Sequence, residues 1–485
     1  MIPRQKSSQD ILFFLIYFFG FSACTNQIKP SIQKPNIILV VSDDHGSDAL
    51  GCYGNPAIQT PNLDNFGAEG IRFNNAYCTS ASCTASRSVI LTGRYGHATG
   101  SYGHAHLYHH FSTYDNVVSL PVMLEKAGYM TARIGKYHVA PEKVYFFKKV
   151  IDANDRNPVE MAVKCKEVLN SKEPFFLYFC TGDPHRWDVA GVKTQAWDKP
   201  NSFGNKKEGI PGGKTIDYNP KDVIVPDFLP DTKECREELA QYYQSVSRVD
   251  QGFGKLMDLL RESGKQDNTI VIYISDNGVA FPGAKTTAYE PGLKLPCLIK
   301  NPFINSRGII NNAKISWVDL TPTILDMAGI DFDKNQFHGR SFKNILGIEN
   351  PDGWNMIFAS HTFHEVTMYY PMRVCIDKNF KLIWNIAWRL DYPFASDLWA
   401  SSTWQDIYRN KREYYGKRKV NDYLFRPEFE LYDLDADPSE TDNLADNAEY
   451  CNVLDKMKTK IREFQKNTSD PWLIVNEYNA ERQNN

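Results

Sequence analysis

Four short apolar segments along the chain each end abruptly in a polar cluster. They are residues 37–41, 130–134, 175–180 and 270–274, and each is followed within a few residues by Asp, His, Lys or Asn. Continuous apolar runs of this length are typical of strands buried on both faces of a sheet that helices cover. Because ligands bind beyond the carboxyl ends of the strands in such sheets, we expect the four polar clusters to converge on one site.

Amphipathic patterns between the apolar segments predict helices. Apolar residues recur at roughly helical spacing over 239–263, shorter helical patterns lie at 120–126 and 453–465, and another begins at Thr321. The segment 199–226 is rich in Pro, Gly and Lys, and we expect it to form a long loop at the wall of an active site.

The order of these elements predicts an α/β fold with two domains. A chain of 485 residues with 42% hydrophobic content is too long for one small core. We expect a large mixed, mostly parallel sheet sandwiched by helices in a catalytic domain over 33–345. Short strands then alternate with turns before a last helix, which predicts a smaller C-terminal α+β domain over 346–478 that contributes to the substrate pocket.

The net charge of −3 is close to balanced. A nucleic-acid-binding protein would be expected to carry a clustered stripe of Lys and Arg, so we expect no nucleic-acid partner.

The amino terminus has the pattern of an export signal. Arg4 and Lys6 precede the apolar run 11–21, which is too short to favour a membrane-spanning helix. The run closes on Ser22-Ala23-Cys24, which resembles a bacterial lipobox and implies a lipoprotein signal peptide over 1–24 with lipid on Cys24. We expect a periplasmic or cell-surface lipoprotein that meets the membrane only through this anchor. The alternatives are an ordinary signal peptide cleaved after Ala23 and a weak membrane anchor.

Ten cysteines are scattered along the chain without tight regular spacing. In an exported protein they could form a disulfide framework, but the irregular spacing favours mostly buried free thiols. Cys52 and Cys78 are the first pair to test.

The run from Cys83 to Arg87, followed by Thr92-Gly93, places a thiol at the start of a predicted helix. Ser82 or Thr84 could cap this helix, so residue 83 would lie where unpaired backbone N–H groups favour an anion. Arg87 adds a permanent positive charge one turn further on. The alternative is a buried structural thiol.

This pattern, C-x-A-x-R-x4-T-G, resembles the signature of the type I sulfatases of the alkaline phosphatase superfamily, although Ala85 stands where Pro is usual. The resemblance covers the chain from about Pro35 to the last helix. It implies that a maturation enzyme oxidises Cys83 to formylglycine, whose hydrate attacks sulfur, and that Cys83 and Arg87 belong to the catalytic set.

Asp43, Asp44, Asp276 and Asn277 form a candidate metal site at two of the strand ends. This all-oxygen set suits a hard divalent cation, Ca²⁺ or otherwise Mg²⁺. The alternative for Asp43 and Asp44 alone is a helix cap after a strand. The family resemblance adds residue 83 to the ligands.

Four further residues have chemistry that sulfuryl transfer needs. Lys136 and His138 stand two apart, so an extended segment would turn both to one side, where Lys136 would hold an oxygen and His138 would orient or deprotonate the nucleophile. His185 is the candidate general acid. The alternatives are solvated turn residues and a structural histidine. Lys285 would contact a sulfate oxygen.

Several motifs narrow the resemblance to the heparan N-sulfatase (sulfamidase) branch of the family. They begin at Asp183, Ser275, Tyr289, His364 and Tyr370. The substrate contacts that this branch implies are Asp183, Arg186, His364, Glu365 and Arg373, and the alternative for the last two is a salt bridge between domains. The chain departs from the branch at Lys285, where Arg is expected, and over 104–106.

The sequence therefore predicts a hydrolase that removes the N-sulfo group from terminal N-sulfoglucosamine of heparan sulfate or heparin fragments. Its partners would be a sulfated glycosaminoglycan oligosaccharide and the maturation enzyme, and a homodimer is an open possibility. The alternatives are an O-sulfatase acting on another sulfated glycan, a phosphoester or phosphonate hydrolase, and a surface glycan-binding lipoprotein with an inactive site.

Overall fold

The structure, a computed structural model, describes residues 34–186, 201–305 and 307–474. The predicted signal peptide and Cys24 lie outside the described residues. Residues 34–474 belong to one compact unit that contains two main sheets, so the predicted boundary at 345 and 346 stays a prediction. Among the described residues, no helix combines the length and the apolar character needed to cross a bilayer.

The larger sheet has nine strands and is mixed but mostly parallel, as predicted. Its antiparallel pairs all involve β8 or the short β7. Eight strands follow one another in space in the order β4 (Lys149–Ile151), β3 (Met130–Gly135), β5 (Phe175–Cys180), β1 (Asn36–Ser42), β6 (Thr269–Ser275), β8 (Cys297–Lys300), β2 (Ile71–Tyr77) and β7 (Lys294–Leu295). The ninth strand, β9 (Ile309–Ser316), pairs with β2.

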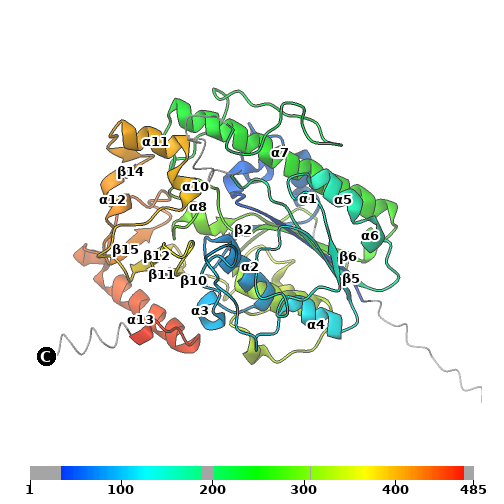
Figure 1. Cartoon of the computed structure of the whole chain (residues 1–485). Coiled ribbons are helices and arrows are strands. Elements are labelled where there is room, and N and C mark those ends of the chain that lie inside the picture. Colours follow the sequence, from blue (N-terminus) through cyan, green and yellow to red (C-terminus); the bar gives the residue numbers. More distant parts are fainter. Residues whose placement is uncertain (1–33, 187–200, 306, 475–485) are drawn as a thin grey trace, which may run out of the picture. The chain divides into compact units, whose positions relative to one another are not determined.

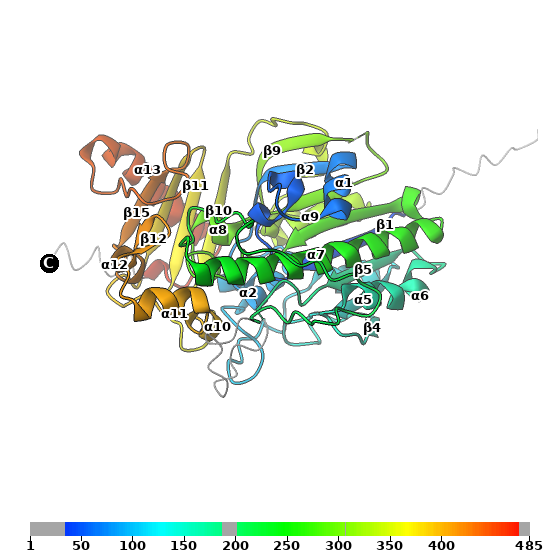
Figure 2. The ribbon, with the colours of Figure 1, turned by 90° about the horizontal axis from the view of Figure 1, so that it is seen from above.

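Helices cover both faces of this sheet, as Figures 1 and 2 show. Alternate side chains of β1 enter two different cores: Leu39 packs on one face and Val40 on the other. This is why the strand is apolar at every position. The covering helices are α1 (Pro61–Glu69), α5 (Pro158–Lys164), α6 (Lys166–Leu169) and α7 (Lys233–Glu262) on the Val40 face, and α2 (Cys83–Thr92), α4 (Leu120–Lys126) and α9 (Leu320–Met327) on the Leu39 face.

The helix α7 begins earlier than its apolar pattern indicates. The prediction started at residue 239, whereas the helix starts at Lys233 because Thr232 caps it and accepts a hydrogen bond from the backbone N–H of Cys235. The described part of the predicted loop, 201–226, contains no helix or strand, as expected.

A smaller antiparallel sheet follows, in the order β10 (Met356–His361), β11 (Met372–Asp377), β12 (Phe380–Asn385) and β15 (Phe429–Asp433). The helix α13 (Cys451–Asn467) packs on it through Met457 and Ile461, close to the predicted 453–465. The remaining elements are α3 (Gly96–Thr99), α8 (Glu290–Leu293), α10 (Ser396–Trp399), α11 (Ser402–Arg409), α12 (Val420–Leu424), β13 (Tyr414–Tyr415) and β14 (Arg418–Lys419).

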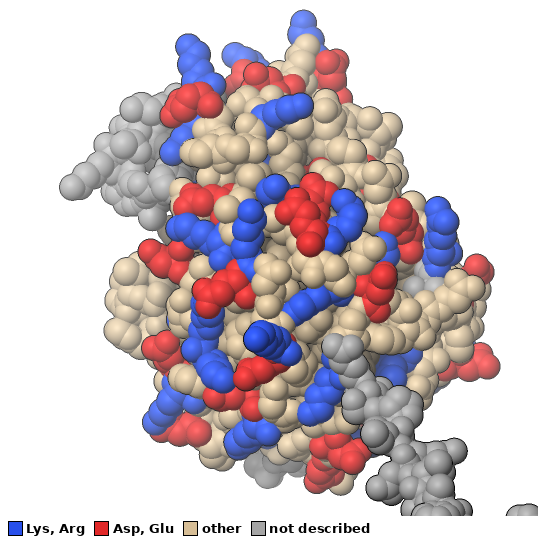
Figure 3. Space-filling model, turned by 90° about the vertical axis from the view of Figure 1, so that its right-hand side faces the viewer, with Lys and Arg blue, Asp and Glu red and all other residues tan. Residues whose placement is uncertain are grey.

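The cysteines and the surface charges follow the sequence prediction. All nine cysteines in the described part of the chain are free, including Cys52 and Cys78. On the face shown in Figure 3, basic and acidic side chains are interspersed, in keeping with a net charge of −3.

Candidate active site

Two neighbouring parallel strands deliver the carboxylates of the site. β1 and β6 pair along their whole length, so Asp43 and Asp44 leave the sheet beside Asp276. Asp44 turns into the left-handed backbone region, and its N–H donates to Oδ1 of Asp276 at 3.1 Å. One ligand atom from each of Asp43, Asp44, Cys83 and Asp276 lies within 4.8 Å of all the others. The polar ends of distant apolar segments thus meet at one place.

Cys83 is the first residue of α2 and is completely buried. Its Sγ lies 3.7 Å from Oδ1 of Asp44. Ser82 is the cap residue, as expected, but its hydroxyl contacts Nδ1 of His364 at 2.9 Å and makes no capping bond to the helix. Burial raises the pKa of the Cys83 thiol well above its usual range, despite two nearby lysines. The unmodified thiol is therefore protonated at neutral pH, and a thiol is a much weaker nucleophile than a thiolate.

Buried cations balance the carboxylates. Burial raises the pKa of Asp276 to about 7, with the other two aspartates adding to the effect. Burial by itself would also raise the pKa of Asp43. The positive charge of Lys136, and after it those of His185 and Arg87, outweighs the effect of burial and holds the pKa of Asp43 well below its usual value. The ion pairs are Arg87 Nε to Asp276 Oδ2 at 2.8 Å, Arg87 Nη2 to Asp43 Oδ1 at 3.5 Å, Lys285 Nζ to Asp44 Oδ2 at 2.9 Å, and Lys136 Nζ to Asp43 Oδ2.

Asn277 gives a direct test of whether these residues fit a metal ion. Its Nδ2 donates to Oδ1 of Asp44 at 2.6 Å, whereas its Oδ1 is buried and has no hydrogen-bond partner among the described residues. A buried carbonyl oxygen without a donor is costly. Three carboxylates and one such oxygen form the kind of ligand set that hard divalent cations take, so the residues fit the predicted ion.

His185 lies against the same group. Its Nδ1 contacts the carbonyl of Arg186 at 2.6 Å, so Nδ1 carries the proton and Nε2 faces Asp44 Oδ2 at 3.7 Å and Asp397 Oδ2 at 4.0 Å. Ligand atoms of His185, Asp44 and Cys83 also lie within 4.8 Å of one another. Burial, and after it the charge of Lys285, lowers the pKa of His185 to about 4.

His138 contacts a neighbouring histidine, and its predicted role toward residue 83 stays a prediction. It adopts a left-handed backbone conformation, and its Nε2 contacts Nδ1 of His106. No described contact joins it to Cys83. The left-handed conformation breaks the extended geometry on which its pairing with Lys136 was based, so the two side chains have different partners.

Three predicted substrate contacts are buried structural pairs in the structure. Asp183, Arg186 and Arg373 are at most 1% exposed, and protein groups occupy their charged atoms. Buried pairs of this kind hold the fold together, and the contacts of these three residues with a sugar stay a prediction. The partners are Arg248 Nε and Arg156 Nη1 for Asp183, Glu238 for Arg186, and Asp470 for Arg373.

His364 reaches the site, and Glu365 holds the start of α10. His364 contacts Ser82, next to residue 83, and its Nε2 lies 3.0 Å from Nε2 of His104. Oε1 of Glu365 accepts from the backbone N–H and the hydroxyl of Ser396, at 2.8 and 2.6 Å, where α10 begins. The segment after β10 therefore lies against the start of α2.

Sequence reasoning missed one residue of the site, Asp397 on α10. Its Oδ2 lies 3.2 Å from Nζ of Lys285, and its Oδ1 is buried without a partner among the described residues. Lys285 and Asp397 are 112 residues apart, and no local pattern links them.

Comparison with known proteins defines the class. Residues 35–330 match the sulfatase domain, and residues 284–396 match the family described as N-sulphoglucosamine sulphohydrolase, C-terminal. The chain belongs to the sulfatase family and is an enzyme of that family.

Three known proteins are similar to this chain over most of their length. The chain is 36% identical over 464 residues to human N-sulphoglucosamine sulphohydrolase, covering 91% of each protein. It is 26% identical to an N-acetylglucosamine-6-O-sulfatase of Bacteroides thetaiotaomicron, covering 97% of this chain and 93% of that protein. The solved structure of BT4656 with its substrate D-glucosamine-2-N,6-O-disulfate has the same fold, with a TM-score of 0.66, 23% identity and coverage of 90% of this chain and 99% of that one.

Proposed function

We propose that this sulfatase hydrolyses the N-sulfo group of terminal N-sulfoglucosamine in heparan sulfate or heparin fragments. The reaction takes up water, breaks the S–N bond, and releases sulfate and a protonated amine. The observation that carries the proposal is the match of residues 284–396, because this region supplies Lys285, His364 and Glu365. An O-sulfatase of another sulfated glycan is the second candidate, supported by the 26% identity to the 6-O-sulfatase.

Asp43, Asp44, Asp276 and Asn277 would hold Ca²⁺, with Mg²⁺ as the alternative. The bound cation would supply positive charge to the oxygens of the sulfo group. Residue 83, converted to formylglycine, would supply the hydroxyl that attacks sulfur. The conversion would be needed because Cys83, a buried and protonated thiol beside Asp44, is a poor nucleophile itself.

The buried cations orient the sulfo group and its neighbours. Arg87 holds Asp276 and Asp43 in place, and the ammonium groups of Lys136 and Lys285 lie where developing negative charge on sulfate oxygens needs compensation. Lys285 is a point charge with three rotatable donors, so its grip differs from the planar fork of an arginine.

His185 would deliver the proton to the leaving nitrogen through Nε2. In the free protein its pKa is about 4, so it starts neutral. An anionic sulfo group placed beside it favours the imidazolium and raises that pKa. The unpartnered Oδ1 of Asp397 would accept from a sugar hydroxyl, and Glu365 would close the edge of the pocket.

We further propose that the protein is exported and anchored by lipid on Cys24, and that a formylglycine-generating enzyme matures it. These proposals rest on the motifs around residues 24 and 83. Loss of membrane attachment in a Cys24→Ala variant would be expected, and an unchanged distribution would refute the anchor.

The test of function is a pair of reactions with N-sulfoglucosamine and glucosamine 6-O-sulfate, scored for free amine and free sulfate. We expect equal amounts of amine and sulfate from the first sugar. Sulfate released only from the second sugar, with no new amine, would replace the proposal by the O-sulfatase.

A further inference from the structure

The carboxylate of Asp397 faces two residues of the catalytic group. Its Oδ2 lies 3.2 Å from Nζ of Lys285 and 4.0 Å from Nε2 of His185. The side chain of Lys285 is completely buried, whereas that of Asp397 is 15% exposed. Asp397 therefore borders the place where His185 would meet the leaving group, on the side that a substrate can approach.

This carboxylate has unused capacity to accept hydrogen bonds. A carboxylate offers two oxygens and about four lone-pair positions. Among the described residues, Lys285 supplies the one hydrogen bond to Oδ2, and Oδ1 is buried without a partner. A substrate group that donates would satisfy an acceptor that the protein leaves open.

Asp397 is ionised in the free protein. Burial opposes its charge, but the charge of Lys285, and after it that of His185, outweighs burial and lowers the pKa of Asp397 below the usual value. At neutral pH the side chain therefore accepts hydrogen bonds and has no proton to donate.

A sulfamate and a sulfate ester differ at the atom that leaves. The sulfamate nitrogen carries a hydrogen, whereas the bridging oxygen of an ester carries none. A nitrogen about 2.9 Å from Nε2 of His185 can lie equally close to Oδ2 of Asp397, because these two atoms are 4.0 Å apart. An ester oxygen in the same place would turn its lone pairs toward a carboxylate, which is unfavourable.

We propose that Asp397 selects a sulfamate over a sulfate ester by accepting the N–H of the leaving nitrogen through Oδ2. This inference rests on the proposed function and names the residue that sets its specificity. A site that pairs with a substrate N–H can reject an analogue that lacks it by about 10⁴-fold, because the protein group is then left unpaired. Oδ1 stays available for a sugar hydroxyl.

Asp397 also takes part in the proton and electron balance of the step. Nε2 of protonated His185 gives its proton to nitrogen, which then carries two hydrogens and a positive charge. The attacking oxygen bonds to sulfur as the S–N bond breaks, and the electron pair of that bond stays on nitrogen. The anionic Asp397 stabilises the positive charge that nitrogen carries until the bond breaks.

The experiment uses Asp397→Asn and two sugars that differ at one atom. N-sulfoglucosamine is the substrate, and glucose 2-sulfate, which has oxygen in place of the N–H on the same carbon, is the competitor. We expect kcat/KM for N-sulfoglucosamine to fall by about 10²-fold or more. The inhibition constant of glucose 2-sulfate should also fall, by about 10-fold, since the amide is uncharged and its NH₂ can donate to the ester oxygen.

The matched control is Asp406→Asn on the neighbouring helix α11. The carboxylate of Asp406 binds Arg412 and Asn410, so its loss should leave both constants unchanged. Circular dichroism of both variants checks that they fold.

The two constants separate selection of the leaving group from a role through Lys285. Lys285 would grip the sulfo group of both sugars, so an effect through it would weaken both. An inhibition constant of glucose 2-sulfate that stays the same or rises would therefore overturn the proposal, as would an unchanged kcat/KM for N-sulfoglucosamine. Failure of the proposed function would appear already in the wild type, which would then release no amine from N-sulfoglucosamine.

Discussion

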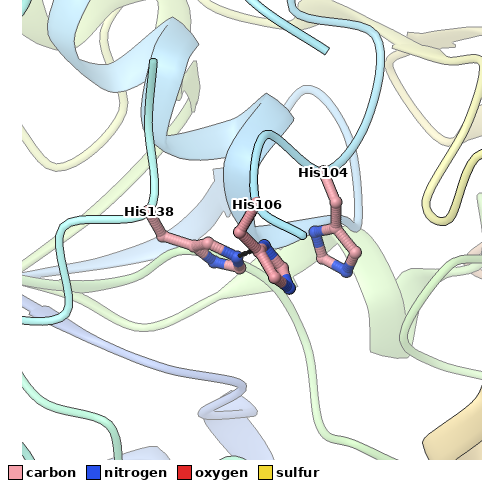
Figure 4. A group of neighbouring side chains, drawn as sticks. All are labelled: His104, His106 and His138. Carbon is pink, nitrogen blue, oxygen red and sulfur yellow. Dashed lines mark hydrogen bonds between the residues drawn. The ribbon is translucent and has the colours of Figure 1, made fainter. Parts of the chain in front are cut away.

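The oxygen-rich group of Asp43, Asp44, Asp276 and Asn277 and the imidazole group of His104, His106 and His138 (Figure 4) are built differently. The carboxylates stand at the ends of β1 and β6, two strands paired over seven residues, and each carboxylate has a buried cation as partner. The imidazoles stand on loops and contact one another. Paired strands fix positions within a rigid sheet, whereas loops can change without disturbing it. The sheet therefore holds the first group in place, whereas the second depends on how two loops pack.

The largest expected effect comes from breaking the oxygen-rich group. Asp276→Asn removes a charge from the metal site and leaves Arg87 buried without its main partner, so we expect turnover to fall by about 10³-fold or more. Removing metal with a chelator should have the same effect and should be reversed by Ca²⁺. Steady-state kinetics measures both.

The matched control is Asp319→Asn. Asp319 is also buried, but it accepts from the backbone of Ser316 and Arg340, away from the site. It should lower stability and leave turnover of the folded enzyme unchanged. Full activity of metal-free protein would contradict the assignment.

His185 connects the oxygen-rich group to the leaving group. His185→Gln should lower turnover on N-sulfoglucosamine by about 10²- to 10⁴-fold, because an amine leaves only when its nitrogen is protonated. The loss should be much smaller on an aryl sulfate, whose phenolate leaves without a proton. Equal losses on the two substrates would show that His185 has another role.

Arg373 tests whether a buried ion pair or a contact with the sugar determines the role of a predicted substrate residue. Its guanidinium is fully buried against Asp470, so Arg373→Met should lower the free energy of unfolding by about 3–5 kcal/mol and leave the KM of the folded enzyme unchanged. Urea unfolding and steady-state kinetics measure the two effects. A raised KM with unchanged stability would restore the predicted contact with the sugar.

The same pair gives a pH dependence. Burial opposes the charge of Asp470, but the bonds to Arg373 outweigh it and lower the pKa to about 2. The unfolded carboxyl has a pKa of about 3.9. The stabilisation is therefore complete above about pH 4 and is lost as the pH falls toward 2, so the difference between wild type and Arg373→Met should shrink on acidification.

The smallest expected effect is that of Glu365, which accepts hydrogen bonds from Ser396 where α10 begins. Glu365→Gln should raise the KM for N-sulfoglucosamine by about 10-fold or less and leave kcat nearly unchanged, because the residue holds the start of α10 and closes the pocket. Glu142→Gln, at an exposed carboxylate, is the control. A fall in kcat with unchanged KM would place Glu365 in the chemical step.

The sequence determined the strands of the large sheet and the residues at their ends. The predicted 37–41, 130–134, 175–180 and 270–274 correspond to β1, β3, β5 and β6 within one residue at each end. Strands buried on both faces are apolar at every position, and parallel strands end at the same edge, so local pattern and topology together placed Asp43, Asp44 and Asp276 in one group.

Only the tertiary structure decided which charged residues face the substrate and which hold the fold. Arg186 pairs with Glu238 and Arg373 with Asp470, across 52 and 97 residues. Asp397 reaches Lys285, and His104 reaches His364 across 260 residues. A charged side chain has the same local pattern whether it binds a ligand or a distant residue, because the sequence near it does not encode its partner. The partner depends on how the two sheets and the loops between them pack.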